Sequence, residues 1–332
     1  MKCARGLTIL CCILLSLFSE VEGDVAKQYT PLQKHPQLFD DRQGWLEGWF
    51  DPAFNSMMRS LREGNESALW ELLHEETPGV YSFPMWTPKF CRFLMEEIDN
   101  YKQTGLPIRR PNSMNNYGLV VNEIGMLPML TKLQQIYLQP IAKLLFPEEG
   151  AVFHGHHSFM VQYKQGEDLG LDMHTDDSDV TFNICLGKEF VAAGLTLCGT
   201  VGTPDHRQLA HKYDHIPGRC IVHLGSKRHG ADDIITGERN NLIVWNHNED
   251  FRARGGTKAR GFAKESDIPH QDCLSYTHDR DYSLLKEFPQ GERGRVAKAT
   301  NKRQAWCPPN HACYDSMAPV LKRGSSYEFR HL

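Results

Sequence analysis

The pattern of hydrophobic positions divides the chain into a helical part and a strand-rich part. Between residues 45 and 150, apolar residues recur at the 3.6-residue period of an amphipathic helix, most clearly over residues 90–98 and 130–145. From residue 153 to 246 the apolar runs become short, rich in β-branched and aromatic residues, and separated by Gly, Asp and Pro. Helices with one apolar face need a surface to cover, so we expect them to pack on a sheet formed by the second part.

Five runs in the second part have the composition of β-strands. Each is short, as is typical of sheets whose strands are joined by irregular links. They are residues 159–163, 180–186, 195–197, 220–224 and 241–245. We therefore predict a mainly β protein with flanking helices (α+β), whose core is a double-stranded β-helix, or jelly roll, packed by the N-terminal helices.

The first residues have the pattern of a secretory signal. Lys2 and Arg5 form a positive start, residues 7–18 are largely apolar, and small residues precede a cut at Asp24. As a helix the apolar run is only about 18 Å long, short of a hydrocarbon core of roughly 30 Å, which favours a cleaved signal over a membrane anchor. The predicted order is a signal peptide (1–23), a lead and helical region (24–150), the jelly-roll core (151–250) and a C-terminal extension (251–332).

Charge excludes some classes of partner. The net charge is −4, with 37 basic and 41 acidic residues, and no basic block is interleaved with aromatic residues. Nucleic acid is therefore not an expected partner. After the signal, no stretch is apolar for long enough to span a bilayer, so no stable membrane span is expected. Together with the signal, this predicts a protein of the secretory pathway, in the endoplasmic reticulum lumen or secreted.

The number and positions of the cysteines indicate which of them can form disulfides. Removal of the signal leaves seven of the ten cysteines, so at least one thiol stays unpaired or pairs between chains. Cys185, Cys198 and Cys220 lie in apolar, strand-like runs, and we interpret them as buried hydrophobic thiols. Cys307 and Cys313 flank two prolines in a polar tail and are the predicted local disulfide of an oxidising compartment.

The candidate metal site consists of His174, Asp176 and His229. Residues two apart on a strand point to the same face, so His174 and Asp176 can offer a nitrogen and an oxygen to one ion. The third ligand must come from another strand, and His229, which follows the apolar run 220–224 and a Gly-Ser turn, suits a strand end facing that pair. Two His and one carboxylate on one face leave coordination positions open, as in non-haem Fe(II) oxygen chemistry.

Three further residues are candidates for binding a co-substrate. Arg239 precedes the apolar strand 241–245, and its planar fork matches a carboxylate with two hydrogen bonds. Tyr163, on an earlier strand, either adds a hydroxyl to the same carboxylate or is a core aromatic. Asn183 sits mid-strand, where Asn is disfavoured, which indicates an inward contact with the co-substrate or with a metal-bound histidine.

Segments around these residues resemble the catalytic core of the 2-oxoglutarate and Fe(II)-dependent oxygenases, and most of all the prolyl 4-hydroxylase and lysyl hydroxylase branch. They are FMVQY (159–163), HTD (174–176), VTFNICLG (180–187) and the stretch from HGA to GER (229–239). The later sequence LSYTHDRDY (274–282) is similar to the oxygenase-domain-containing proteins of that superfamily. The resemblance covers roughly residues 85–285.

The resemblance implies Fe(II) bound by His174, Asp176 and His229, with the far carboxylate of 2-oxoglutarate held by Arg239. It implies hydroxylation of a protein or peptide side chain with dioxygen, decarboxylation of 2-oxoglutarate to succinate, and ascorbate as reductant. Prolyl 4-hydroxylases carry Lys at the position of Arg239, and lysyl hydroxylases carry Arg. The arginine is therefore evidence against a plain collagen prolyl hydroxylase. Residues 192–194 are Ala-Ala-Gly where many relatives have two adjacent glycines, and we expect an altered strand bend there.

The remaining histidines and two other functions complete the alternatives. We interpret His154, His156 and His157 as surface or supporting residues, the insert with His206, His211 and His215 as a mobile rim over the site, and His223 as a packed residue. A secreted jelly-roll binding module without catalytic activity is the alternative function. A zinc hydrolase with the same triad is a third, and it leaves Arg239 without a role.

Overall fold

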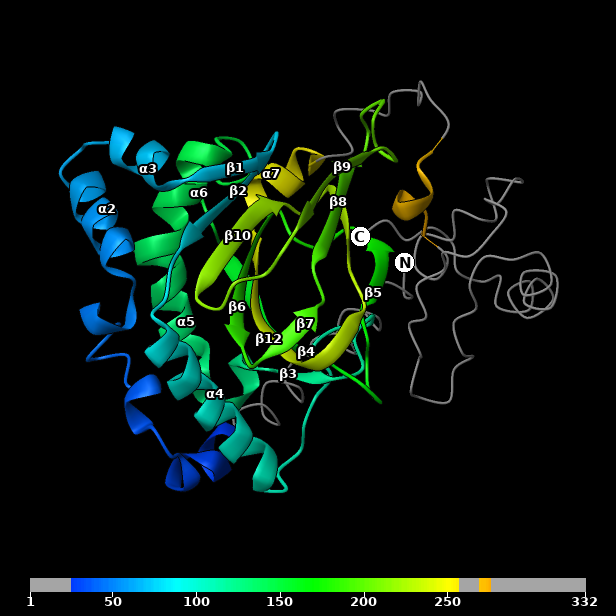
Figure 1. The fold of residues 1–332 in the computed structure, drawn as a ribbon. Helices are drawn as coiled ribbons and strands as arrows, with labels where there is room; N and C mark the ends of the chain where they lie inside the picture. Colours follow the sequence, from blue (N-terminus) through cyan, green and yellow to red (C-terminus); the bar gives the residue numbers. More distant parts are fainter. Residues whose placement is uncertain (1–24, 257–268, 276–332) are drawn as a thin grey trace, which may run out of the picture.

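The computed structural model describes residues 25–256 and 269–275. Within them, strands form two facing antiparallel sheets, and most of the helices lie on one side of the larger sheet (Figure 1). The predicted signal peptide and the predicted Cys307–Cys313 disulfide lie outside the described residues. Among the described residues, no helix is long and apolar enough to cross a bilayer.

Eight core strands build the predicted jelly roll. They are β4 (Gly155–Lys164), β5 (Leu171–His174), β6 (Val180–Gly187), β8 (Leu195–Thr200), β9 (Leu209–Tyr213), β10 (Arg219–Leu224), β11 (Lys227–Ala231) and β12 (Ile234–His247). The large sheet contains the order β10-β6-β12-β4 and the small sheet the order β5-β11-β8-β9, so the chain passes repeatedly from one sheet to the other. Two packed four-stranded sheets connected in this way are a double-stranded β-helix, and the predicted fold class is confirmed.

The large sheet extends beyond this core. Strands β1 (His74–Thr77) and β2 (Val80–Pro84) add to the β10 edge, β3 (Gly118–Val120) adds to β4, and the short β7 (Phe190–Ala192) pairs with β12. The helical pattern predicted for residues 45–150 therefore missed the short strands β1, β2 and β3. Each is five residues or fewer and is held by pairing with a strand distant in sequence, which a local pattern does not report.

Helices before the core cover the outer face of the large sheet, as predicted (Figure 1). They are α2 (Pro52–Arg62), α3 (Ser67–Leu72), α4 (Pro88–Gln103), α5 (Leu127–Leu133) and α6 (Gln139–Leu145), with π-helical turns at Asn122–Met126 and Gln134–Leu138 and 3-10 turns at Thr30–Leu32, Pro36–Leu38 and Glu47–Trp49. The Thr87 hydroxyl caps α4 by accepting from the Phe90 amide at 3.2 Å, with proline at the first helical position. Helix α7 (Glu249–Ala253) follows the last strand.

Both faces of the large sheet are buried, and side chains alternate between them. On β6, Phe182 and Ile184 join the core shared with the helices, whereas Asn183 faces the space between the sheets. On β12, Val244 packs toward the helices and Trp245 toward the small sheet. Burial on both faces explains why these strands are continuous apolar runs rather than alternating ones.

The small sheet is where the strand predictions failed. Strands β9 and β11 were not predicted, and β5 was expected only as the strand that carries His174, because the sequences LAHKY, KRHGA and LDMH mix polar and apolar residues without β-branched enrichment. They are held by pairing within the sheet, with β11 between β5 and β8. As a result His229 lies within a strand, not at a strand end as predicted.

A disulfide joins Cys198 on β8 to Cys273 in the 3-10 turn Gln271–Cys273. The interpretation of Cys198 as a free thiol was therefore wrong, because this residue lies on the outer face of the small sheet, where residues 269–275 pack against it. Arg228 on β11 also reaches this segment, and its Nε donates to the Cys273 carbonyl at 2.7 Å. Cys185 and Cys220 are buried free thiols, as predicted, and so is Cys91.

Removing this disulfide should cost stability. The cross-link spans 75 residues, so a Cys198→Ala/Cys273→Ala double variant should lose about 2–4 kcal/mol of unfolding free energy through the less constrained unfolded chain. Thermal unfolding would show this as a fall in Tm of roughly 5–15 °C. Cys91→Ala, which removes a buried thiol that forms no disulfide, is the matched control, and reductant should destabilise the wild type but not the double variant. Equal melting temperatures of the double variant and the oxidised wild type would contradict the prediction.

The Ala-Ala-Gly bend contains two residues in the left-handed region. Ala192 has φ 66° and Ala193 has φ 58°, so the conformation that glycine tolerates is imposed on alanine. Ala192 is exposed and should lose no packing, and we expect Ala192→Gly to stabilise the protein by up to about 1 kcal/mol in denaturant unfolding. Ala193 is fully buried, so Ala193→Gly also removes a packed methyl group and should gain less. A larger gain at Ala193 than at Ala192 would refute this account.

Candidate active site

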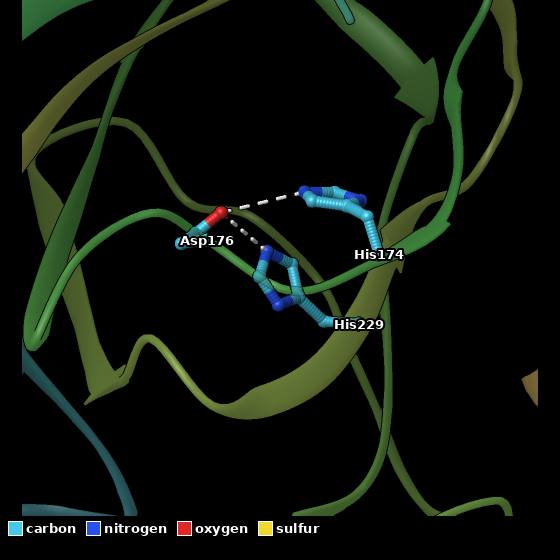
Figure 2. A group of neighbouring side chains, drawn as sticks. All are labelled: His174, Asp176 and His229. Atoms are coloured by element: carbon cyan, nitrogen blue, oxygen red, sulfur yellow. Dashed lines mark ion pairs between the residues drawn. The ribbon is translucent and has the colours of Figure 1, made fainter. Parts of the chain in front are cut away.

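The three predicted metal-binding residues converge between the sheets. His174 ends β5, and His229 lies directly opposite it on the neighbouring strand β11. Asp176 was predicted to lie on the same strand as His174. It lies instead in the turn after β5, where its amide donates to the Gly225 carbonyl at 2.9 Å. Figure 2 shows the three side chains pointing toward one another.

Distances in this group suit one ion. The Oδ1 atom of Asp176 lies 3.4 Å from Nε2 of His174 and 3.6 Å from Nε2 of His229 (Figure 2). One ligand atom from each residue lies within 4.8 Å of the other two. Two ligands held about 2.1 Å from an ion at right angles are about 3 Å apart, so small shifts would place all three around one ion. Among the described residues this is the one such group of three or more His, Cys, Asp or Glu side chains.

Hydrogen bonds orient each of the three side chains. Nδ1 of His174 lies 2.8 Å from the Asp172 carbonyl, and Nδ1 of His229 lies 2.8 Å from the Lys227 carbonyl. Each bond places the imidazole proton on Nδ1 and leaves the lone pair of Nε2 facing the shared centre. The second carboxylate oxygen of Asp176 accepts from the Thr181 hydroxyl at 2.7 Å, which leaves Oδ1 for the same centre.

The electrostatics favour the charge state that binds a cation. Burial lowers the pKa of His229 to about 3, so its imidazole is neutral at physiological pH. Burial alone would raise the pKa of Asp176, but the adjacent His229 and His174 outweigh it and hold that pKa well below the usual range. A neutral imidazole and an ionised carboxylate are the forms that coordinate metals.

The site opens into a cavity between the sheets. Its volume is about 440 Å³ with the mouth included, and about half of its lining residues are polar or charged. His174, Asp176 and His229 lie on its wall together with Arg239 and Tyr163. A concave space where apolar side chains surround convergent polar groups is the usual form of a small-molecule site.

Arg239 projects from β12 into this cavity, as predicted, and is 1% exposed. Its Nη1 donates to Oδ1 of Asn241 at 3.0 Å, and the guanidinium carbon lies 4.5 Å from the centre of the Tyr163 ring. Burial lowers the pKa of Arg239, but a guanidinium remains protonated in proteins. The cavity therefore contains a buried cation, which favours an anionic ligand.

Tyr163 and Asn183 both reach this region. The Tyr163 hydroxyl accepts from Nδ2 of Asn115 at 3.1 Å, and burial raises the pKa of that hydroxyl to about 12, so its own proton is retained for donation. Oδ1 of Asn183 accepts from Nδ2 of Asn241 at 2.6 Å. Asn183 thus contacts Asn241, the residue that holds Arg239. One of the two predicted alternatives was a contact between Asn183 and a metal-binding histidine, and this bond goes to a different residue.

Three contributors were missed from the sequence. Thr181 and Asn241 lie two residues from Asn183 and Arg239 on the same strands, so strand parity could have placed them on the cavity side. Asn115 comes from the segment before β3, and no local signal marks its contact with Tyr163.

Three of the other described histidines are accounted for by packing, and a fourth differs from the prediction. His156 and His157 form hydrogen bonds to Thr131 Oγ1 and the Pro111 carbonyl, and His223 is fully buried beside His229. The prediction of a mobile rim was wrong for His215, which is 6% exposed and lies with Nδ1 3.3 Å from Nδ2 of Asn241. The loop after β9 turns inward there, so His215 is buried against Asn241 without lining the cavity.

Comparison with known proteins adds family information. Residues 25–151 match a family model described as the OGFOD2-like domain. A 2-oxoglutarate and iron-dependent oxygenase domain-containing protein, CP2 of Arabidopsis thaliana, is 38% identical over 213 residues, covering 61% of this chain and 53% of the relative. Domain-containing protein 2 of the same description from Xenopus tropicalis is 36% identical over 232 residues, covering 69% of this chain and 65% of the relative.

Solved structures overlap less closely with the chain. A Trichoplax adhaerens prolyl hydroxylase in complex with a peptide fragment covers 61% of this chain and 93% of its own, at 15% identity and a TM-score of 0.40. The fold assignment therefore rests on the strand order of this protein. The chain spans about half to two thirds of the length of the curated relatives given above. The chain therefore carries an OGFOD2-like domain and is similar to relatives named as 2-oxoglutarate and iron-dependent oxygenase domain-containing proteins.

Proposed function

We propose that this protein is an Fe(II)- and 2-oxoglutarate-dependent oxygenase that hydroxylates a side chain of a protein or peptide, with decarboxylation of 2-oxoglutarate to succinate. The observation that carries the proposal is the position of a buried Arg239 in the same cavity as His174, Asp176 and His229. A metal triad on one wall and a cation on another suit a ligand with two separated anionic ends.

One group of residues would bind the metal, and a second group would bind the co-substrate. His174, Asp176 and His229 would hold Fe(II) by two nitrogens and one oxygen, a donor set with open positions that fits this ion. Bound Fe(II) with 2-oxoglutarate supplies the activation of dioxygen. Arg239 would bind the far carboxylate of 2-oxoglutarate, and the Tyr163 hydroxyl has a proton to donate to it.

The cavity lining shapes the reaction as well as the binding. Apolar side chains such as Phe159, Ile243 and Trp245 limit water around the metal-binding residues, which strengthens the electrostatic contacts made there. Thr181 keeps one oxygen of Asp176 occupied and therefore fixes which oxygen faces the metal position.

The substrate and location belong to the same proposal. A protein or peptide substrate is supported by the resemblance of residues 159–239 to prolyl 4-hydroxylases and lysyl hydroxylases, and Arg239 favours the lysyl type. The signal-like residues 1–23 and the Cys198–Cys273 disulfide support the secretory pathway, because disulfides persist in oxidising compartments. Ascorbate is the reductant we propose from the same resemblance.

Succinate formation that depends on both Fe(II) and 2-oxoglutarate tests the activity, and a panel of lysyl, prolyl and aspartyl peptides tests the substrate. We expect turnover to rise with a matching peptide and to stop with a chelator. A binding module without catalysis would show no succinate and no stabilisation by 2-oxoglutarate with Fe(II). A zinc hydrolase would consume no dioxygen, and Arg239 would have no role in it.

A further inference from the structure

The side chain of Asn241 holds Arg239 through a buried polar network. Asn241 is fully buried on β12, and its Oδ1 accepts from Nη1 of Arg239 at 3.0 Å. Its Nδ2 donates to Oδ1 of Asn183 at 2.6 Å and lies 3.3 Å from Nδ1 of His215. Both polar atoms of the Asn241 amide are therefore used, by Arg239 on the same strand, by Asn183 on β6 and by His215 in the loop after β9.

These partners allow Asn241 only one orientation. A rotated amide would place its oxygen against the acceptor oxygen of Asn183 and its NH₂ group against the guanidinium, which would lose all three bonds. Burial lowers the pKa of His215 well below its usual value, so its ring is neutral and Nδ1 can accept. Asn183 and His215 thus fix the oxygen of Asn241 toward Arg239.

The network leaves one edge of Arg239 for a ligand. The Tyr163 ring covers a face of the guanidinium, and Asn241 occupies Nη1. Among the described residues, Nε and Nη2 have no hydrogen-bond partner although the side chain is 1% exposed. Nε and Nη2 form the side of the guanidinium whose two parallel N–H bonds match the two oxygens of a carboxylate. Unpaired buried donors are costly, so a ligand that pairs them is strongly favoured.

We propose that Asn241, fixed by His215 and Asn183, is the positioning residue that presents the Nε–Nη2 edge of Arg239 to the far carboxylate of a 2-oxo diacid. This inference rests on the proposed function and adds three residues that act through Arg239, of which Asn183 also lines the cavity and Asn241 and His215 do not. It distinguishes recognition of the far carboxylate from binding at the metal. Loss of the Asn241 side chain should therefore weaken binding of the far carboxylate and leave binding at the metal unchanged.

The test measures binding of two 2-oxo acids to the full chain loaded with Mn(II), by calorimetry. 2-Oxoglutarate carries the far carboxylate, whereas pyruvate has the same 1-carboxylate and 2-oxo group but lacks it. We expect the preference for 2-oxoglutarate over pyruvate to fall about tenfold in Asn241→Ala, the effect of one hydrogen bond to a charged group. His215→Phe, which keeps a ring but removes the acceptor, should lower the preference by a smaller factor.

The neighbouring residue is the matched control. Asn240 is also fully buried on β12, but its Nδ2 donates to Oε1 of Glu238 at 2.9 Å, and Asn240 does not line the cavity. Asn240→Ala should leave the preference unchanged. If Asn241→Ala does not fold, His215→Phe and Asn183→Ala serve in its place, and their combined effect should be less than the product of the two single effects, because both act through Asn241.

Two results would overturn the inference while leaving the proposed function in place. One is an unchanged preference in Asn241→Ala, and the other is an equal loss of affinity for both acids, which would indicate a purely structural role. A wild-type protein that binds 2-oxoglutarate no better than pyruvate would overturn the proposed function and this inference together.

Discussion

Replacement of Asp176 by alanine should lower Fe(II) affinity by more than about 100-fold and reduce succinate formation to background. Substitution of a residue that only orients a metal ligand costs 10–100-fold, so loss of the one carboxylate in the triad should cost more. Two buried neutral imidazoles would remain, and they lack the charge that compensates a divalent cation. Metal titration of the purified variant measures the first effect, and a succinate assay the second.

Asp177→Ala is the matched control for this experiment. Asp177 is the next residue, but its carboxylate pairs with Arg252 at 3.1 Å on the surface. The control should bind Fe(II) and turn over as the wild type does. Preserved turnover in Asp176→Ala would remove the basis for the assigned metal site.

Substitution of Arg239 by methionine should raise the 2-oxoglutarate concentration needed for half-maximal turnover by roughly 100-fold or more, because two charge-assisted hydrogen bonds are lost. Methionine keeps much of the apolar contact with the Tyr163 ring, which limits the effect on folding. Fe(II) affinity should not change, since the hydrogen bond of Arg239 in the described residues goes to Asn241 and not to a metal-binding residue. The readout is the half-saturation constant for 2-oxoglutarate beside the metal titration.

Arg239→Lys separates charge from geometry. Lysine retains the cation but not the planar fork, so its half-saturation constant should lie between those of the wild type and the methionine variant. Arg219→Met is the control outside the cavity, because Arg219 on β10 donates to the Ser82 hydroxyl at 2.7 Å. A methionine variant of Arg239 with an unchanged half-saturation constant would exclude this residue as the carboxylate anchor.

Much of the fold follows from local pattern alone. The strands β4, β6, β8, β10 and β12 carry side chains buried on both faces or nearly so, and such runs are recognisable without any partner. The helical period before residue 150 likewise predicts helices that cover a sheet. The triad could be proposed from the sequence because imidazole and carboxylate groups are common ligands of Fe(II), and the motif HTD places one of each two residues apart.

Contacts between distant segments decided the rest. Strand β5 is held by its pairing with β11, which lies between β5 and β8, and that pairing sets His229 opposite His174, which no local preference encodes. The same holds for the Cys198–Cys273 disulfide and for the inward turn of His215 toward Asn241. The amino-acid sequence thus determined which chemical groups the protein has and most of its strongly apolar elements. Only the tertiary structure decided which of these groups meet, because pairing register and burial depend on neighbours many residues away.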